Sequence, residues 1–474
     1  MSIFNNNILA GAAAQSTTTP VHTIDQSIRF NDDDSPSLDK TYSGAGSRTT
    51  FTFSCWFKIG NTGVTFPFFN GGTGASDTGW TGVSYSSSKI YVQGFNTNWK
   101  ITSRVLRDPS AWYHLVFVWD TTNTIASERI RIYINGQRET DFSTSNNPSA
   151  SANAGIGQAQ KHSIGYQSRA VGSGYADAYM AELVYIDGTA LDPSSFGEYN
   201  SSNIWIPKDV SGLTFGTNGF HIDGRDSADL GDDESGNGND FTTSGLAAHD
   251  QVADSPTNNF CVMNPLNTNS SMTLSNGNLQ STASAHTGSG GTILLPSTGK
   301  WYCEFRYNSG LNNEYPVVGV YNTIKNLTTT AVNPGKVSGD LDVGFGIDGR
   351  RNEDDTNTSS WGNSVTNGKI GALAIDTENK KIWFGHNNSG SFVWQVSGDP
   401  SAGTNEANTK DFADDLIFGN SHYIGSNLTW NFGQDGTFGG TETAQGNTDA
   451  NGVGNFYFTV PTGYQALCTK NIGA

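Results

Sequence analysis

The stretch RIRIYINGQRET, residues 129–140, combines a strict alternation of side chains with a tight-turn dipeptide. Ile130, Ile132 and Ile134 fall on one side of an extended chain, because successive side chains of a strand point to opposite faces. Asn135-Gly136 supplies the two residues with positive φ that a two-residue hairpin needs. The stretch therefore predicts a half-buried strand that ends in a hairpin turn.

The same pattern of short strand and turn recurs along the chain, at KIYVQG (residues 89–94), ELVYIDG (182–188) and KIWFGHNNSG (381–390). No segment of helix length has apolar residues at the three-and-four spacing of an amphipathic helix. We therefore predict an all-β protein, built as two β-sandwiches with a short N-terminal arm.

Composition limits the classes of partner. Among 474 residues, 26 are basic and 44 acidic, which gives a net charge of −18. This charge repels phosphate backbones and anionic lipid headgroups, so neither nucleic acid nor a membrane is an expected partner. No apolar run approaches the roughly 18 residues of a membrane span, and no Lys or Arg precedes the apolar residues at the start, so a secretory signal peptide is not predicted.

The four cysteines do not form the pattern of a disulfide framework in so long a chain. Cys55 shares strand parity with Phe51, Phe53 and Phe57, and Cys303 with its own aromatic neighbours. We expect these two cysteines to be buried small hydrophobic residues; Cys261 and Cys468 are assigned no role.

The chain divides into four predicted segments. Residues 1–25 form a Gly/Ala/Thr-rich arm, residues 26–206 carry evenly spaced strands, 207–259 are a Gly/Asp-rich connecting region with short strands, and 260–474 resume the strand pattern. The segment AWYHLVFVW, residues 111–119, is apolar on both faces, as expected of a central strand inside a sandwich.

The first set of strands resembles a known fold. DPSAWYHLVFVW (residues 108–119), RIRIYINGQ (129–137) and AELVYIDGTALDPSSF (181–196), in this order, resemble the laminin-G-like, concanavalin-A-like jelly roll. The strands after residue 260 resemble a SPRY domain, in GKWYCEFRY (299–307), the 376–385 hairpin and the closing NFGQ (431–434). The second resemblance implies a β-sandwich used for recognition that carries no catalytic machinery.

The arm and the linkers carry a further resemblance. MSIFNNNILAGAAAQ (residues 1–15), RFNDDDSPSL (29–38), GTNGFHID (216–223), DSPTNNF (254–260) and the domain order are similar to structural proteins of marine tailed phages. This resemblance implies a fibre or an appendage of a virion.

Catalytic motifs are weak in this sequence. GFGIDG, residues 344–349, satisfies Gly-x-Gly-x-x-Gly, but no helix follows it, so glycines of a strand and its turn explain it better. The histidines are scattered singly, and His114 is expected to be a hydrogen-bonded core residue. A glycosidase would need two carboxylates on one concave face, whereas Glu182 and Asp187 should face opposite sides of their strand. We expect no enzymatic activity.

Acidic residues gather in turns instead, above all in DDESGNGND, residues 232–240. Oxygen ligands around glycines are what a hard cation such as calcium requires, and an Asx-rich surface turn is the alternative. The calcium ligands predicted for this turn are Asp232, Asp233, Asn237, Asn239 and Asp240. No other cofactor is predicted.

Aromatic residues in polar loops are the candidates for glycan binding: Trp80, Trp99 and Trp361. A flat ring can stack on the apolar face of a sugar while its polar neighbours bind the hydroxyls. The alternative for each is a ring that folds back over the sandwich edge.

Rigid sandwiches that present loops are typical of recognition or assembly. The function we predict is a non-enzymatic structural protein of a tailed-phage virion, made in the host cytoplasm and exposed on the particle, with a host-surface glycan as a further partner. The rivals are a cellular carbohydrate-binding adhesin and a polysaccharide-degrading tailspike. Presence in purified particles separates the first from the second, and release of sugar from host polysaccharide identifies the third.

The N-terminal arm is the predicted attachment segment. It begins with Phe4, Ile8 and Leu9 among Asn and Ala, and alone it cannot bury enough surface to become ordered. We therefore expect it to bind other virion proteins or further copies of this chain around a symmetry axis, with a trimer favoured.

Overall fold

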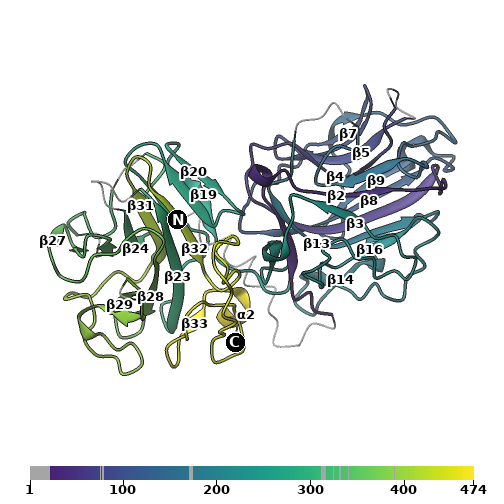
Figure 1. Cartoon of the computed structure of the whole chain (residues 1–474). Helices are drawn as coiled ribbons and strands as arrows, with labels where there is room; N and C mark the ends of the chain where they lie inside the picture. Colours follow the sequence, from purple (N-terminus) through teal and green to yellow (C-terminus); the bar gives the residue numbers. More distant parts are fainter. Residues whose placement is uncertain are drawn as a thin grey trace. The chain divides into compact units, whose positions relative to one another are not determined.

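The computed structural model describes residues 22–74, 76, 79–169, 174–310, 316–323, 325–329, 332–339, 341–388 and 390–473. The chain divides into two compact units, with the boundary between Asn258 and Asn259. The described residues of 22–258 are called the first sandwich and those of 259–473 the second (Figure 1). The predicted arm, with Phe4, Ile8 and Leu9, lies outside the described residues as far as residue 21.

The first sandwich contains two large antiparallel sheets and a small hairpin. Sheet 1 runs in the order β10 (Gln137–Arg138), β9 (Ile130–Ile134), β8 (Trp112–Asp120), β3 (Thr50–Ile59), β13 (Ala178–Asp187), β1 (Ser27–Phe30) and β18 (Gln251–Val252), and β16 (Phe220–Ile222) pairs with β13. Sheet 2 runs β11 (Phe142–Ser145), β7 (Asn98–Thr102), β6 (Lys89–Gly94), β5 (Thr81–Ser86), β4 (Phe66–Gly71), β12 (Lys161–Ile164), β2 (Ser37–Thr41) and β17 (Thr242–Ser244). The hairpin joins β14 (Gly197–Tyr199) to β15 (Trp205–Pro207).

The hairpin predicted from residues 129–140 is confirmed. Ile134 pairs with Gln137 across a two-residue turn, in which Asn135 and Gly136 have φ angles of 50° and 74°. Ile130, Ile132 and Ile134 all lie in the core between the two sheets. Gly136 has no Cβ, so it adopts positive φ at the second turn position without strain, and Asn135 tolerates positive φ at the first.

Aromatic side chains from both sheets interlock in this core. Phe53 of sheet 1 stacks on Phe69 of sheet 2 with ring centroids 5.1 Å apart. His162 is fully buried beside them, and burial lowers its pKa to about 4. The core therefore holds its histidine neutral, with Nε2 accepting from Gly157 N–H and Nδ1 facing Gln160 O.

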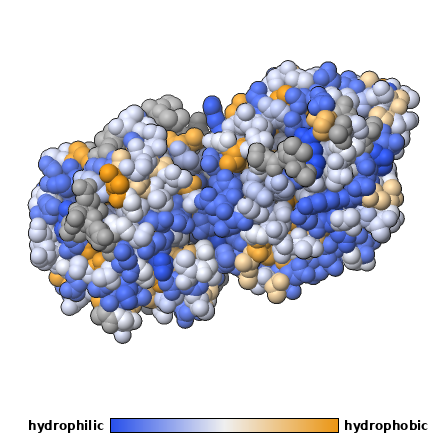
Figure 2. Space-filling model, turned by 45° about the horizontal axis from the view of Figure 1, so that its top comes forward, coloured by the Kyte–Doolittle hydropathy of each residue, from blue (hydrophilic) through white to orange (hydrophobic). Residues whose placement is uncertain are grey.

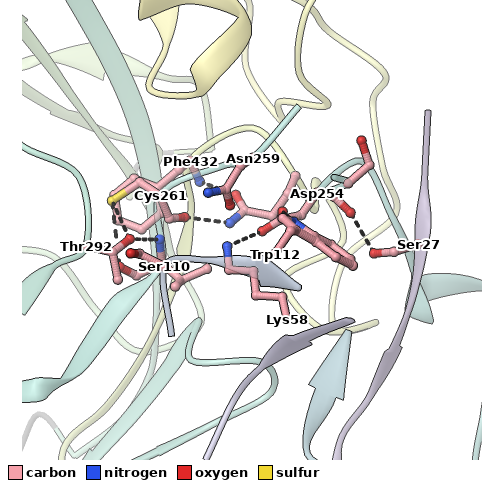
Figure 3. Close-up of polar contacts among 12 residues, drawn as sticks. Ser27, Lys58, Ser110, Trp112, Asp254, Asn259, Cys261, Thr292 and Phe432 are labelled. Atoms are coloured by element: carbon pink, nitrogen blue, oxygen red, sulfur yellow. Dashed lines mark hydrogen bonds and ion pairs between the residues drawn. The ribbon is translucent and has the colours of Figure 1, made fainter. Parts of the chain in front are cut away.

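The region predicted to connect the domains, residues 207–259, contributes strands to the first sandwich. β16 pairs with β13, β17 with β2, and β18 with β1. Asp254 fastens the end of this region to sheet 1 (Figure 3): its carboxylate lies 2.7 Å from Lys58 Nζ and accepts Trp112 Nε1 at 3.0 Å. Ser27 Oγ donates to the Asp254 carbonyl. The first sandwich thus extends to residue 258 rather than ending near 206.

Strand β13 contains a bulge that changes its side-chain parity. Two residues lie between the paired positions Ala181 and Val184 where the partner strand has one, and Glu182 has a φ of 49°. Its buried carboxylate lies 3.1 Å from His221 Nε2 and 3.9 Å from His22 Nε2. The bulge interrupts the alternation between Glu182 and Asp187, and alternation resumes after it, with Leu183 and Tyr185 in the core and Val184 and Ile186 in the outer cluster.

The second sandwich also contains two large sheets. Sheet 3 runs β19 (Met263–Thr268), β22 (Thr287–Gly291), β31 (Leu416–His422), β24 (Val317–Asn322), β25 (Val343–Gly346), β26 (Arg351–Glu353) and β27 (Thr356–Thr358). Sheet 4 runs β20 (Met272–Ser275), β21 (Gln280–Ala283), β32 (Asn427–Asn431), β23 (Lys300–Ser309), β28 (Ile370–Asp376), β29 (Lys381–His386) and β30 (Val393–Trp394), and β33 (Gln465–Ala466) adds parallel to β23. The short helix α2 spans Thr469–Ile472.

Several sequence predictions are confirmed in the second sandwich. Gly344 and Gly346 lie in β25, and Gly349 lies in the turn that follows, so GFGIDG is a strand and its turn. Cys303 is buried, as predicted, as is Cys55 in the first sandwich, and Cys261 and Cys468 are buried too. The chain is an all-β protein of antiparallel sandwiches, as predicted.

Buried carboxylates organise the loops of this fold. Glu304, fully buried in β23, accepts hydrogen bonds from Tyr457 N–H, Phe458 N–H, Asn431 Nδ2 and Tyr302 O–H. Because a carboxylate has about four acceptor sites, this one is saturated. Part of the excess of acidic residues therefore serves to hold the chain together.

Hydrophilic side chains dominate the face seen in Figure 2, with hydrophobic ones scattered over it. Exposed large hydrophobic residues are likewise dispersed in sequence, as Ile125, Tyr199, Leu266 and Ile424 illustrate. Within the described ranges, no helix is long and apolar enough to cross a membrane.

Candidate functional site

The outer faces of sheets 1 and 2 differ in what covers them. The outer face of sheet 1 is packed beneath the segment that carries β14 and β15, in two apolar clusters. The first cluster contains Val116, Val118, Tyr133, Val184, Ile186, Phe196, Val210 and Phe215. The second contains Ile24, Trp56, Ala181, Trp112 and Trp205. Sheet 1 therefore has little outer surface to offer a ligand.

Sheet 2 presents a polar row on its outer face. The row is set by cross-strand pairing, which joins Asp39, Ser163, Asn70, Gly82, Gln93 and Asn98 in that order. Their neighbours along each strand, such as Leu38, Val83 and Val92, point into the core. With strands about 4.8 Å apart, the row crosses six strands over ~24 Å.

Asn70, at the centre of this row, uses its whole side-chain amide. Its Oδ1 accepts from Trp80 Nε1 and from Ser168 N–H, and its Nδ2 donates to the carbonyls of Ser163 and Tyr166. The side chain is fully buried. It therefore fixes residues 163–168, the segment that leads to Arg169.

Trp80 lies over the row at Gly82. A Cβ at Gly82 would stand 3.1 Å from the Trp80 ring, so the absence of a side chain there makes room for the indole. Arg169 covers Trp80, with its guanidinium carbon 4.6 Å from the indole centroid and 4.7 Å from that of Phe95. The Arg169 cation is therefore within cation–π distance of both rings.

Beside Arg169 and these rings, strands β6 and β7 leave polar groups accessible. Gln93 Nε2 donates to Asn98 Oδ1 at 2.9 Å, and Asn98 is exposed while Gln93 and Tyr91 are half-buried. We call Tyr91, Gln93, Phe95, Asn98 and Arg169 the β6–β7 face. It offers amide groups for hydroxyls and aromatic rings for an apolar surface.

The tryptophans predicted to bind glycans have different surroundings. Trp80 is only 1% exposed, so the prediction that its ring is free to stack on a sugar is wrong: Gly82, Asn70 and Arg169 enclose it. Trp99 is half-buried against the first core, edge-on to Trp119. Trp361 is half-buried against the second core. Glycan binding by Trp99 and Trp361 stays a prediction.

The turn predicted to bind calcium does not fit that role. The carboxylate of Asp233 accepts from the backbone N–H groups of His221, Ser235 and Asn239 and from Ser235 Oγ. The side-chain amides of Asn237 and Asn239 donate to carbonyls of residues 216–219. No group of three His, Cys, Asp or Glu in the described part of the chain could hold a metal ion. Asp232 and Asp240 add charge at this turn, but its geometry is that of an Asx-rich turn.

A buried Ser–His pair in sheet 1 has the geometry of a structural contact. His114 Nε2 lies 2.8 Å from Ser54 Oγ, and Trp205 Nε1 donates to His114 Nδ1 at 3.0 Å. Because an indole N–H only donates, Nδ1 must accept, and Nε2 carries the proton toward Ser54. Burial lowers the pKa of His114 to about 3. This orientation is the opposite of what a general base for Ser54 requires, as the sequence led us to expect of a core histidine.

Carboxylates are sparse on the outer face of sheet 2. In the polar row, Asp39 is the single acid, and it lies 3.0 Å from Lys161 Nζ and accepts Ser163 Oγ. Paired carboxylates of the kind that glycoside hydrolysis uses are thus not found among the described residues of this row.

The comparisons with known proteins agree with the architecture of the first sandwich. Residues 31–194 match the laminin-G family model of the concanavalin A-like lectin/glucanases superfamily. The chain thus contains a concanavalin A-like domain. The polar row and the β6–β7 face both lie within the matched residues. No curated protein matches the chain.

Solved structures match parts of the chain at low identity. The SPRY domain of human HERC1 matches with 17% identity over 35% of this chain and 96% of its own, at a TM-score of 0.25. A heptameric SAP-like pentraxin from Limulus polyphemus matches with 18% identity over 36% of this chain and 79% of its own, at a TM-score of 0.27. Stonustoxin matches with 15% identity over 36% of this chain at a TM-score of 0.29, and the match spans 27% of the stonustoxin chain.

Proposed function

We propose that the concanavalin A-like domain binds a saccharide on the β6–β7 face without chemically changing it. The observation that carries this proposal is the asymmetry of the two outer faces: sheet 1 is covered by residues 190–215, whereas sheet 2 keeps Asn98 exposed and Tyr91 and Gln93 half-exposed. Amide groups in a row bind sugar hydroxyls, and the adjoining tyrosine ring stacks on the apolar side of a pyranose.

Among the described residues of the polar row, no catalytic arrangement is found, and this supports binding without turnover. Asp39 is the one carboxylate of the polar row and is already paired with Lys161, and His114 holds its proton toward Ser54. Within the described part of the row, a hydrolase would find no second acid beside Asp39.

A glycan array probed with the full-length chain tests this proposal. We expect selective binding to a subset of saccharides, weakened at least tenfold in the double variant Gln93→Ala/Asn98→Ala. The control is Gln137→Ala, which removes an exposed amide from edge strand β10 of sheet 1 and should leave binding unchanged. Equal binding by the wild type and the double variant would move the site elsewhere.

We further propose that the protein acts in the virion of a tailed phage, exposed on the particle and attached through residues 1–25. Support comes from the resemblance of residues 1–15, 29–38, 216–223 and 254–260 to such proteins. Deleting residues 1–20 should leave two folded sandwiches that no longer enter particles, as judged by immunoblotting of purified virions. Incorporation at the wild-type level would exclude the arm as the attachment segment.

A further inference from the structure

Arg169 lies within cation–π distance of two aromatic rings. Its guanidinium carbon lies 4.6 Å from the Trp80 ring centroid and 4.7 Å from that of Phe95. Because a guanidinium is planar, its N–H groups lie in that plane and point outward from its edge, while the two rings contact the cation. The side chain is half-buried, and burial lowers its pKa. The cation is therefore fixed in place before any ligand arrives.

The edge of this guanidinium is weakly engaged by the protein. Arg169 Nε and Nη1 donate to Gln167 Oε1 and to Phe95 O, both at the long distance of 3.5 Å. Among the described residues, no carboxylate lies within ion-pair distance of it, in a chain with 44 acidic and 26 basic residues. Arg138, Arg306 and Arg351 each lie within 3.4 Å of a glutamate oxygen.

The arrangement around Arg169 is built from elsewhere in the sheet. Asn70 fixes Ser168 N–H and the Trp80 indole through one oxygen, so the residue before Arg169 and the ring beneath it are positioned together. Phe95 follows β6, the strand that carries Gln93. A preorganised guanidinium, which follows β12, thus lies over Phe95 in the turn of the hairpin that carries the amides of the β6–β7 face.

An arginine edge of this kind matches a carboxylate, which can accept two parallel N–H···O bonds. A guanidinium is also weakly hydrated, so binding removes little water from it. The net charge of −18 opposes a polyanion, and one guanidinium neutralises one carboxylate.

We propose that the β6–β7 face selects a saccharide that carries a single carboxylate, with the in-plane edge of Arg169 binding that carboxylate and Gln93 and Asn98 binding neighbouring hydroxyls. This inference rests on the proposed saccharide binding and adds the chemical class of the ligand. Uronate-terminated and sialic-acid-terminated oligosaccharides both belong to this class.

Calorimetric titration of the full-length chain tests the proposal, with 3′-sialyllactose and a glucuronate-terminated trisaccharide, each beside its carboxyl-reduced form. We expect at least one acidic saccharide to bind, and its carboxyl-reduced form to bind at least tenfold more weakly. Equal affinity for both forms would overturn the carboxylate assignment and leave saccharide binding intact. Binding of none of the saccharides on the glycan array would overturn both. A sulfated trisaccharide that binds more tightly than both acidic saccharides would also overturn the assignment.

The variant Arg169→Gln should lose at least tenfold in affinity for the acidic saccharide and bind the carboxyl-reduced form as the wild type does. Arg107→Gln, which removes an exposed arginine of the same sandwich, is the charge-matched control and should bind normally. If Arg169→Gln fails to fold, Arg169→Lys keeps the charge and loses the planar edge, and a loss of at least threefold is expected. Unchanged affinity in the folded Arg169 variant would overturn the proposal.

Discussion

Asn70→Asp is the substitution that tests most sharply how the first sandwich holds its ligand face together. The two side chains have nearly the same shape, so packing is preserved. The Nδ2 group, however, donates to the carbonyls of Ser163 and Tyr166 at 2.9 Å and 2.8 Å, and a carboxylate oxygen would face those carbonyls instead. Both carbonyls would lose a donor in a fully buried site.

The magnitude follows from these two lost hydrogen bonds. Each buried bond of this type contributes roughly 0.5–1.5 kcal/mol, and an acceptor left unpaired costs more. We expect the first sandwich to lose about 3 kcal/mol of unfolding free energy, which for a domain of this size lowers Tm by about 6–12 °C. The loss should shrink at pH 4, because the introduced carboxyl, once protonated, can donate to one of the two carbonyls.

Urea unfolding monitored by tryptophan fluorescence measures this change, with the transitions of the two sandwiches fitted separately. Asn98→Asp is the matched control: its Oδ1 already accepts from Gln93, the residue is exposed, and its effect should stay within about 0.5 kcal/mol. If Asn70→Asp is as stable as Asn98→Asp, the amide of Asn70 does not organise this face.

Three further predictions concern the rest of the first sandwich. Burial lowers the pKa of His221, but the hydrogen bond to Glu182 opposes this and holds the pKa above 6.5. The stability that this pair contributes is therefore fully present below pH 6.5 and is lost as pH rises through the higher folded value. Glu182→Gln should flatten the Tm profile between pH 6 and 8.5, and an unchanged profile would contradict the pairing. Asp233→Asn should lower Tm because donors in the turn lose their acceptor, while a calcium chelator leaves the wild-type Tm unchanged; a chelator-induced drop would restore the calcium site. Asp254→Ala should cost about 3–5 kcal/mol because Lys58 is left charged and buried, and a loss below about 1 kcal/mol in urea unfolding would show that this ion pair does not fasten residues 207–258.

The strands of both sandwiches were predictable because their signals are local. Alternation placed Ile130, Ile132 and Ile134 in the core, and Asn135-Gly136 marked the turn. The short strands β16, β17 and β18 were not assigned to the first sandwich, since three residues or fewer carry too little periodicity to show which sheet they join. Their partners, β13, β2 and β1, lie far away in sequence.

The candidate site was harder to predict. Trp80 stands among Asp, Thr and Gly, which suggested an exposed ring, but Gly82 two residues later removes the side chain that would have kept the indole off the sheet. Arg169 and Asn70 carry no motif; their roles follow from cross-strand pairing of β4, β5 and β12. Arg169 could have been suspected only as an isolated basic residue in an acidic chain.

The central claim is that the β6–β7 face binds saccharide, and a crystal structure of the full-length chain with the tightest-binding array saccharide tests it most directly. The account predicts sugar density over Tyr91, Gln93 and Asn98, with any carboxylate in the plane of the Arg169 guanidinium. Sugar bound in the second sandwich, beside Trp361 for example, with none on sheet 2, would contradict it.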